Sequence, residues 1–296
     1  MKILNFGSLN IDHVYNVPHF VRPGETLSCH KYERFCGGKG LNQSIALARA
    51  GAIVFHAGCI GPDGLWLKSI LAESGVDTSL IESVKGPSGH ALIQVVPDGA
   101  NSIIIHGGAN KNITAEYIES VMDSCAVGDY LLLQNEINSI PEIMARGAEL
   151  NMKIVFNPAP MDPNVINYPL ETVDCFIVNE TEGWELTREK EAERILTKMV
   201  NQYPGAVSVL TLGEKGALLG RENDRLAASA EKVQAVDTTA AGDTFIGFFL
   251  ASLASGRKLE HSLDTACKAA AICVSRPGAA DSIPSMEEVL LFAGDN

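Results

Sequence analysis

The chain has 296 residues, of which 46% are hydrophobic and 20% charged, and its formal net charge is -13. This composition is typical of a globular protein built on one large domain, and the acidic balance argues against nucleic acids and anionic membranes as partners. Seven cysteines without a CxxC pair, no signal-peptide core and no apolar stretch of roughly 20 residues predict a cytoplasmic protein with reduced thiols and no membrane span.

The first third of the chain predicts strands of two kinds. Residues 2–6 form a short apolar strand that ends in polar residues. Residues 14–35 alternate loosely between apolar and polar side chains, and residues 91–106 alternate on both sides of a turn, as in a hairpin. Because alternation is typical of a sheet with one exposed face, we expect residues 12–36 and 89–107 to form a small sheet that stands off the main domain.

The remaining segments alternate between strands and helices. Gly37-Gly38-Lys39-Gly40 begins a helix that stops at Gly51, and a helix capped by Asp63 covers residues 63–74. Further strands are expected at residues 53–57, 130–134, 153–157, 175–179 and 207–212, and further helices at 114–126, 139–150, 189–202, 242–255, 260–275 and 285–292. This order predicts a single α/β domain with a doubly wound, mostly parallel sheet flanked by helices.

Polar residues follow five of the predicted strands. In a doubly wound sheet, ligands bind beyond the carboxyl ends of the strands, so these positions are candidates for a functional crevice. They are Asn10, Asp12, Gln134, Asn135, Glu136, Asn157, Asn179, Glu182 and Gly213. Any one of them alone is more simply a turn former.

The stretch Val236–Asp243 leads directly into an apolar helix. Ala240, Ala241 and Gly242 have little bulk, so an anion can approach the free N–H groups of the first helical turn. Asp243 then stands beside the anion, where it can accept a proton from an attacking hydroxyl. An aspartate that only caps the helix explains the stretch equally well at this point.

Other common chemical motifs are missing from the sequence. Gly37-Gly38-Lys39-Gly40 does not fit the GxxxxGK[ST] phosphate loop, and it can equally be a tight turn before a helix. The seven histidines include no HExxH pair, and no GxSxG segment suits a serine hydrolase. Histidine-bound metal catalysis and serine hydrolysis are therefore not expected.

Three motifs together resemble one known family over nearly the whole chain. Gly37-Gly38-Lys39-Gly40 with Asn42-Gln43 is similar to the N-terminal signature of the ribokinase-like (PfkB) carbohydrate kinases. Asp237–Thr244 is similar to their C-terminal signature, and Asn179–Glu182 to their NxxE motif. The resemblance implies an ATP-dependent carbohydrate kinase in which the small sheet forms a lid, through which two copies often pair as a homodimer.

The resemblance also assigns roles at the nucleotide side of the site. Asp243 matches the base that takes the proton of the sugar's primary hydroxyl, and Ala240, Ala241 and Gly242 match the N–H donors to the transferred phosphoryl group. Asn179 and Glu182 match residues that place Mg²⁺ against ATP, partly through water. The segment along the nucleotide is matched by Thr211, Leu212, Gly213 and Gly216, together with Gly242.

The same resemblance implies a sugar site and a monovalent cation site. The positions matching the sugar ligands are Asn10, Asp12, Gly38, Lys39, Asn42, Glu136 and Asp243. The positions matching the ligands of an activating K⁺ are Asp237, Thr239, Cys273, Arg276, Gly278 and Ser282. Carboxylates and amides grip vicinal hydroxyls, which favours a small sugar, most simply D-ribose; another pentose, a hexose or a nucleoside remains an alternative, as does a non-catalytic sugar-binding relative.

Overall fold

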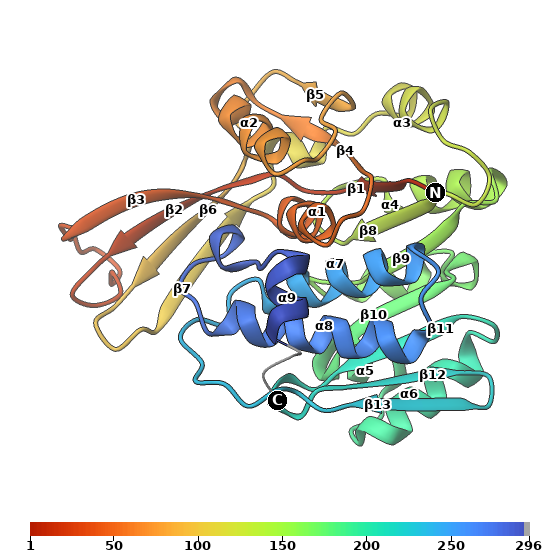
Figure 1. Cartoon of the computed structure of the whole chain (residues 1–296). Coiled ribbons are helices and arrows are strands. Elements are labelled where there is room, and N and C mark those ends of the chain that lie inside the picture. Colours follow the sequence, from red (N-terminus) through yellow and green to blue (C-terminus); the bar gives the residue numbers. More distant parts are fainter. Residues whose placement is uncertain (293–296) are drawn as a thin grey trace.

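A nine-stranded sheet forms the centre of the molecule. The structure, a computed structural model, describes residues 1–292, and its central strands lie in the order β13-β12-β11-β10-β9-β8-β1-β4-β5 (Figure 1). Their bounds are β1 Ile3–Phe6, β4 Val54–Ile60, β5 Ile81–Ser83, β8 Tyr130–Gln134, β9 Lys153–Asn157, β10 Cys175–Asn179, β11 Val207–Thr211, β12 Ala217–Arg221 and β13 Asp224–Ala228. Only β12 and β13 join their neighbours antiparallel, which confirms the predicted mostly parallel sheet.

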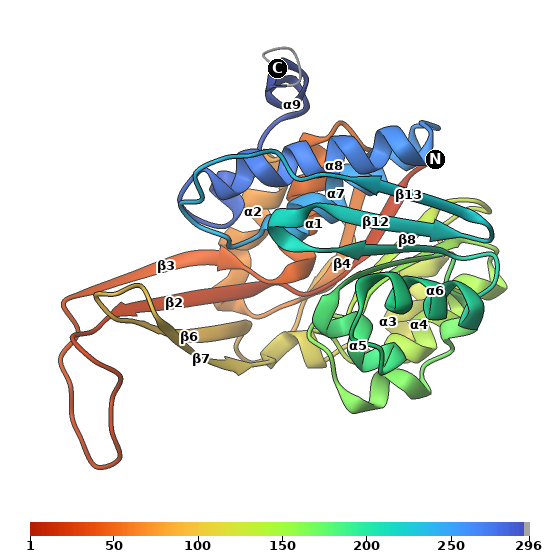
Figure 2. The ribbon, with the colours of Figure 1, turned by 90° about the horizontal axis from the view of Figure 1, so that it is seen from below.

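Helices cover both faces of this sheet (Figure 2). One face carries α1 Lys39–Arg49, α2 Leu65–Glu73, α7 Ala241–Ala254 and α8 Leu259–Val274, and the other carries α3 Ala115–Met122, α4 Ile140–Glu149, α5 Glu180–Thr187 and α6 Ala192–Gln202. A last helix, α9 Met286–Phe292, follows α8. Successive strand residues enter opposite cores, as Ile3 and Leu4 do, so the strands are apolar on both faces.

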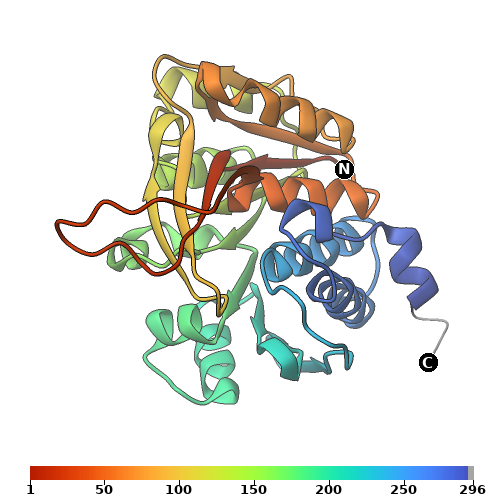
Figure 3. The same cartoon turned by 90° about the vertical axis from the view of Figure 1, so that its left-hand side faces the viewer.

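A second, four-stranded sheet projects from one edge of the main body (Figures 1 and 3). Its strands are β2 Asn10–Asn16, β3 Lys31–Gly37, β6 Gly89–Val95 and β7 Asn101–His106, in the order β3-β2-β6-β7. The two alternating segments thus form one small sheet, as the alternation predicted. That this sheet closes over a ligand as a lid stays a prediction.

The prediction of a cap at Asp63 is wrong. Pro62 begins a short 3-10 turn, Pro62–Gly64, which places Asp63 before the α-helix, and the helix starts at Leu65 without a side-chain cap. Asp63 Oδ1 instead accepts hydrogen bonds from the Ser88 backbone N–H (2.9 Å) and the Ser88 hydroxyl (2.8 Å). The carboxylate therefore fastens the chain where it enters β6.

Two further expectations from the chemistry of the chain can be compared with the structure. All seven cysteines are free, in agreement with the prediction of reduced thiols. Across residues 1–292, none of the helices combines the length and the apolar character that a membrane crossing requires.

Helices α1 and α7 approach each other closely. A Cβ added to Gly247 on α7 would lie 2.3 Å from Ala46 Cβ on α1, which leaves no room for a methyl group. We expect Gly247→Ala to lower the free energy of unfolding by about 1–3 kcal/mol because it overpacks this contact. Chemical denaturation measures the change, and Gly242→Ala, whose Cβ would meet nothing within 4 Å, is the matched control. Equal stability of both variants would contradict the tight contact.

Candidate active site

Asp243 lies on the first turn of α7, and its side chain faces α1. The helix begins after Ala240, which has a left-handed backbone with φ of 60°, and no side chain caps it. Asp243 is 7% exposed, and its two oxygens accept hydrogen bonds from Asn42 Nδ2 (3.1 Å) and Gln43 Nε2 (2.9 Å). The carboxylate is therefore held by two buried amides, and the alternative that Asp243 only caps its helix is wrong.

The start of α7 presents small residues to open space. A Cβ added to Gly242 would meet nothing within 4 Å, so this glycine is not required by packing. The first N–H groups of a helix have no partner in the helix itself. Ala241 N–H lies 3.3 Å from the Thr238 carbonyl, so this donor must leave a long hydrogen bond to serve an anion.

Asp12 and Glu136 form the acidic part of the predicted sugar site. Glu136 Oε2 accepts hydrogen bonds from the Ser8 hydroxyl and from the Lys39 backbone N–H (2.9 Å). A Cβ on Gly37 would lie 2.2 Å from Asp12 Oδ2, so a side chain at this position would displace that carboxylate. Burial, with the nearby charge of Glu136, raises the pKa of Asp12 to about 6. Two partly buried carboxylates side by side are suited to bind hydroxyl groups.

Asn10 is held in place by a residue that the sequence analysis did not single out. Asn110 Nδ2 donates to Asn10 Oδ1 over 2.7 Å, and Asn110 Oδ1 accepts from the Leu9 backbone N–H at 3.0 Å. Asn110 is 1% exposed and lies in the turn after β7. No periodicity or motif marks it, because its importance follows from a contact 100 residues away in the chain.

Lys39, Glu182 and Asp243 line one cavity of about 200 Å³. The carboxylate of Asp243, with Glu136 and Glu182, raises the pKa of Lys39 against the effect of burial. Burial, followed by the charge of Asp243, raises the pKa of Glu182, although hydrogen bonds from Asn179 and the charge of Lys39 oppose the shift. Asn179 and Glu182 also form a capping box at the start of α5, with Asn179 Nδ2 donating to Glu182 Oε1 over 2.9 Å.

A larger cavity of about 690 Å³ adjoins this one, and Thr211, Thr238 and Gly242 line both. Of the residues predicted to lie along the nucleotide, Gly213 and Gly216 line the larger cavity, whereas Leu212 does not line it and packs against the hydrophobic core. The opposite wall, which no prediction covered, consists of Ala230, Glu231, Lys232, Val233, Ala235, Cys267, Ala270, Ala271 and Val274. Most of these residues are small or apolar, which suits the flat, apolar faces of a nucleotide base.

The predicted cation ligands lie together beside α7. Asp237 accepts hydrogen bonds from the Thr239 backbone N–H (2.9 Å) and the Gly278 N–H (3.0 Å). Burial raises the pKa of Asp237, but these bonds and that of the Thr239 hydroxyl outweigh it, so the net shift is downward. Cys273 Sγ lies 3.1 Å from Ser282 Oγ. Arg276 points to Glu288 (2.6 Å), so only its backbone carbonyl remains for a cation.

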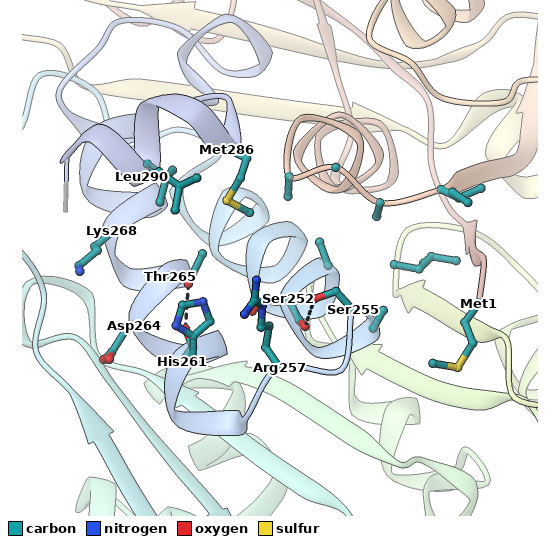
Figure 4. Close-up of a pocket in the computed structure, with 18 residues that line it drawn as sticks. Met1, Ser252, Ser255, Arg257, His261, Asp264, Thr265, Lys268, Met286 and Leu290 are labelled. Carbon is teal, nitrogen blue, oxygen red and sulfur yellow. Dashed lines mark hydrogen bonds between the residues drawn. The ribbon is translucent and has the colours of Figure 1, made fainter. Parts of the chain in front are cut away.

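Another cavity, of about 560 Å³, lies at the other end of α7 (Figure 4). Its walls combine apolar Met286 and Leu290 with polar Arg257 and His261. It contains none of the predicted site residues and lies roughly 16 Å along the helix axis from Asp243. The chemistry predicted from the sequence is therefore gathered at the N-terminal end of α7.

Asp12→Asn is expected to stabilise the protein above pH 6. The folded chain keeps a proton on Asp12 up to about pH 6, whereas an unfolded chain releases it near pH 4, so stability falls as the pH rises through this window. The substitution removes that loss. Thermal unfolding should show a higher transition temperature at pH 7.5 and a gain that shrinks towards pH 4. A difference in transition temperature between Asp12→Asn and wild type that is the same at all pH values would contradict the raised pKa of Asp12.

Comparison with known proteins finds matches to one family over nearly the whole chain. The family model described as pfkB family carbohydrate kinase matches residues 1–286. The chain is 38% identical over 295 residues to a ribokinase of Haemophilus influenzae, covering 97% of this chain and 96% of the relative, and 34% identical over 302 residues to one of Staphylococcus aureus, covering 97% and 98%. The Arabidopsis thaliana ribokinase complexed with ribose and ATP superposes with a TM-score of 0.87 at 28% identity, covering 100% and 99% of the two chains.

Proposed function

The chain belongs to the pfkB family of carbohydrate kinases, and on that premise we propose that it transfers the γ-phosphoryl group of ATP to D-ribose, giving D-ribose 5-phosphate and ADP. One observation carries the proposal. Asp243 and Lys39 line the smaller cavity, the Lys39 backbone N–H donates to Glu136 of the proposed sugar site, and Gly242 lines both this cavity and the larger one proposed for the nucleotide. Relatives over the full chain that are named ribokinase support ribose as the sugar.

In the proposed mechanism the chain positions two substrates and receives one proton. Asp12, Glu136 and Asn42 bind hydroxyl groups of the sugar, so that its primary hydroxyl meets Asp243. The hydroxyl oxygen forms the new P–O bond as the bond between the γ-phosphorus and the ADP oxygen breaks, and the hydroxyl proton passes to Asp243. N–H groups at the start of α7 stabilise the charge of the transferred phosphoryl group, which is the main requirement of a loose transition state.

The residues of the smaller cavity fit a requirement for Mg²⁺. Glu182, Asp243 and Asn157 offer the oxygen ligands that Mg²⁺ prefers, and Mg²⁺ commonly takes one or two carboxylates and completes its shell with water and phosphate oxygens. Both oxygens of Glu182 already accept hydrogen bonds from Asn179, which favours contact through water. When bound, the cation neutralises charge on the phosphates of ATP.

We also propose that K⁺ activates the enzyme at the Asp237 cluster. An ionised Asp237 and the nearby backbone carbonyls suit a hard monovalent cation next to the start of α7. Turnover in K⁺ should exceed turnover in a large organic cation by about tenfold or more, since electrostatic support near the phosphoryl site acts directly on the transition state. Asp237→Asn should abolish the difference. Equal turnover rates in both salts would contradict the proposal of an activating cation site.

The small sheet supports a homodimer in this proposal. On the edge strand β7, Ile103, Ile104 and Ile105 are 49%, 64% and 61% exposed. Ile104 lies opposite Leu92 of β6, which is 40% exposed, and Ile103 and Ile105 lie on the other face, so this edge of the small sheet is apolar on both faces, as at an interface. We propose that a second copy covers it. Light scattering should give twice the chain mass, and Ile104→Lys should return it to the chain mass.

We also propose a cytoplasmic location, supported by the seven free cysteines.

A panel of sugars tests the substrate assignment. ADP release is measured with ribose, 2-deoxyribose, other pentoses, hexoses and nucleosides, in buffer containing Mg²⁺ and K⁺. The highest kcat/KM is expected for ribose, because a closed polar site disfavours analogues that leave its groups unpaired. If another sugar or a nucleoside gives the highest kcat/KM, that compound replaces ribose as the proposed substrate. Sugar binding without ADP release would favour a non-catalytic protein.

A further inference from the structure

Gln43 is the second amide that contacts Asp243, and the proposed reaction gives it no task. Its Nε2 lies 2.9 Å from Asp243 Oδ1, while Asn42 takes the other oxygen. Gln43 lies about one turn before Ala46 on α1, and Asp243 lies about one turn before Gly247 on α7. Because Ala46 and Gly247 are in close contact, the two helices bring the Gln43 amide next to the Asp243 carboxylate.

A chain of buried amides fixes which end of Gln43 faces Asp243. The Gly40 carbonyl can only accept, and it accepts from Asn5 Nδ2 at 2.7 Å. Asn5 Oδ1 then accepts from Gln134 Nε2 (2.9 Å), which also donates to Gln43 Oε1 (2.7 Å). With its oxygen occupied in this way, Gln43 presents its NH₂ group to Asp243. Reversing the amide would place its oxygen against a carboxylate oxygen of Asp243, where no hydrogen bond from the amide could form.

The three side-chain amides of this hydrogen-bonded series are buried. Gln43 and Asn5 are 0% exposed and Gln134 is 1% exposed, so a lost hydrogen bond has no solvent replacement. Each Asp243 oxygen accepts one amide hydrogen and keeps a further lone pair for a proton. Asn42 and Gln43 together therefore restrain rotation of the carboxylate plane.

We propose that Gln43 is a positioning residue for phosphoryl transfer: it fixes the plane of the Asp243 carboxylate, and Gln134 and Asn5 fix Gln43. The inference rests on the proposed function in that Asp243 receives the hydroxyl proton. It assigns to the Gln43 side chain an effect on kcat that does not depend on contact with the sugar or the nucleotide.

The test compares Gln43→Met with Gln134→Met and the double variant. Methionine keeps the length of the side chain but can neither donate nor accept as an amide does. We expect Gln43→Met to lower kcat by about 30- to 100-fold, since small misplacements of reacting groups cost this much, with KM for sugar and ATP changed less than about threefold. Gln134→Met should lower kcat by about tenfold. The double variant should match Gln43→Met, because the two residues act in series.

Ser262→Ala on α8 is the matched control. Ser262 is 0% exposed, and its hydroxyl donates to Ser252 Oγ (3.1 Å) and to the Lys258 carbonyl (3.1 Å), away from Asp243 and the amide chain, so kcat should stay within about twofold of wild type while stability falls. A wild-type kcat in Gln43→Met, a change confined to KM, or additive losses in the double variant would each overturn the proposal. If Gln43→Met does not fold, a wild-type kcat in Gln134→Met overturns it.

The two proposals fail separately. If the wild-type protein prefers another sugar, the substrate assignment is wrong, and the Gln43 comparison is made with that sugar. If wild type phosphorylates ribose and the Gln43 variant does so equally fast, only the positioning role is wrong.

Discussion

Asp243→Asn is expected to lower kcat by about 10³- to 10⁴-fold. The substitution keeps the shape of the side chain but removes the acceptor for the hydroxyl proton, and a positioned base contributes up to about this much. Binding of ribose without ATP should change less than about threefold, because the proposed sugar ligands Asp12 and Glu136 are unchanged. Single-turnover kinetics and calorimetric binding measure the two quantities.

The control for Asp243→Asn is Asp264→Asn on α8, which lines the cavity at the far end of α7. It makes the same chemical change away from the site and should keep the wild-type kcat. Turnover of the Asp243 variant within about tenfold of wild type would show that another group receives the proton, or that the proton leaves to water.

Gly242→Val is expected to lower activity severely without unfolding the protein. No atom lies within 4 Å of an added Cβ, and Gly242 lines both cavities where they share a wall. Valine should therefore occupy the space that the phosphoryl group needs, and kcat/KM for ATP should fall by about 10²- to 10³-fold, as when a donor to the transition state is lost. The free energy of unfolding should change by about 0.5 kcal/mol or less.

A graded series sharpens the Gly242 result. Gly242→Ala adds one methyl group and should lose less activity than Gly242→Val, while sugar binding without nucleotide stays unchanged in both. Retained activity in the valine variant would mean that the phosphoryl group lies elsewhere. A large loss of stability would mean that the glycine serves the fold.

The sequence predicted much of the fold because the parallel strands are short, apolar and separated by amphipathic helices. The bounds of β8, β9 and β10 agree with the predicted residues 130–134, 153–157 and 175–179. The hairpin of β12 and β13 was not predicted. Strand β13 lies at the edge of the sheet and carries exposed polar residues such as Arg225, and the inner strand β12 ends in Gly220 and Arg221, which interrupt its apolar run. Local periodicity is a weaker signal at a sheet edge and in a strand that contains glycine than in an uninterrupted apolar strand.

The site residues also differ in how far they could be predicted from the sequence. Asn42 and Asp243 were found through glycine-rich motifs that can be seen locally in the chain. Asn110 and Gln134 were not assigned tasks, because their tasks depend on contacts with Asn10 and Gln43 that only the folded chain creates. An isolated asparagine or glutamine carries no signal in sequence that separates a turn former from a buried hydrogen-bonding partner.

The contact between Ala46 and Gly247 has a consequence for how this enzyme can change over evolution. Neither residue is assigned to a ligand, yet their spacing sets the distance between the helix that carries Asn42 and the helix that carries Asp243. Alanine at position 247 is acceptable only if position 46 becomes glycine, whereas nothing smaller than Gly247 exists to make room for a residue larger than alanine at position 46. We therefore expect position 247 to stay glycine among homologues unless position 46 is glycine, even where the proposed sugar ligands Asp12 and Glu136 differ.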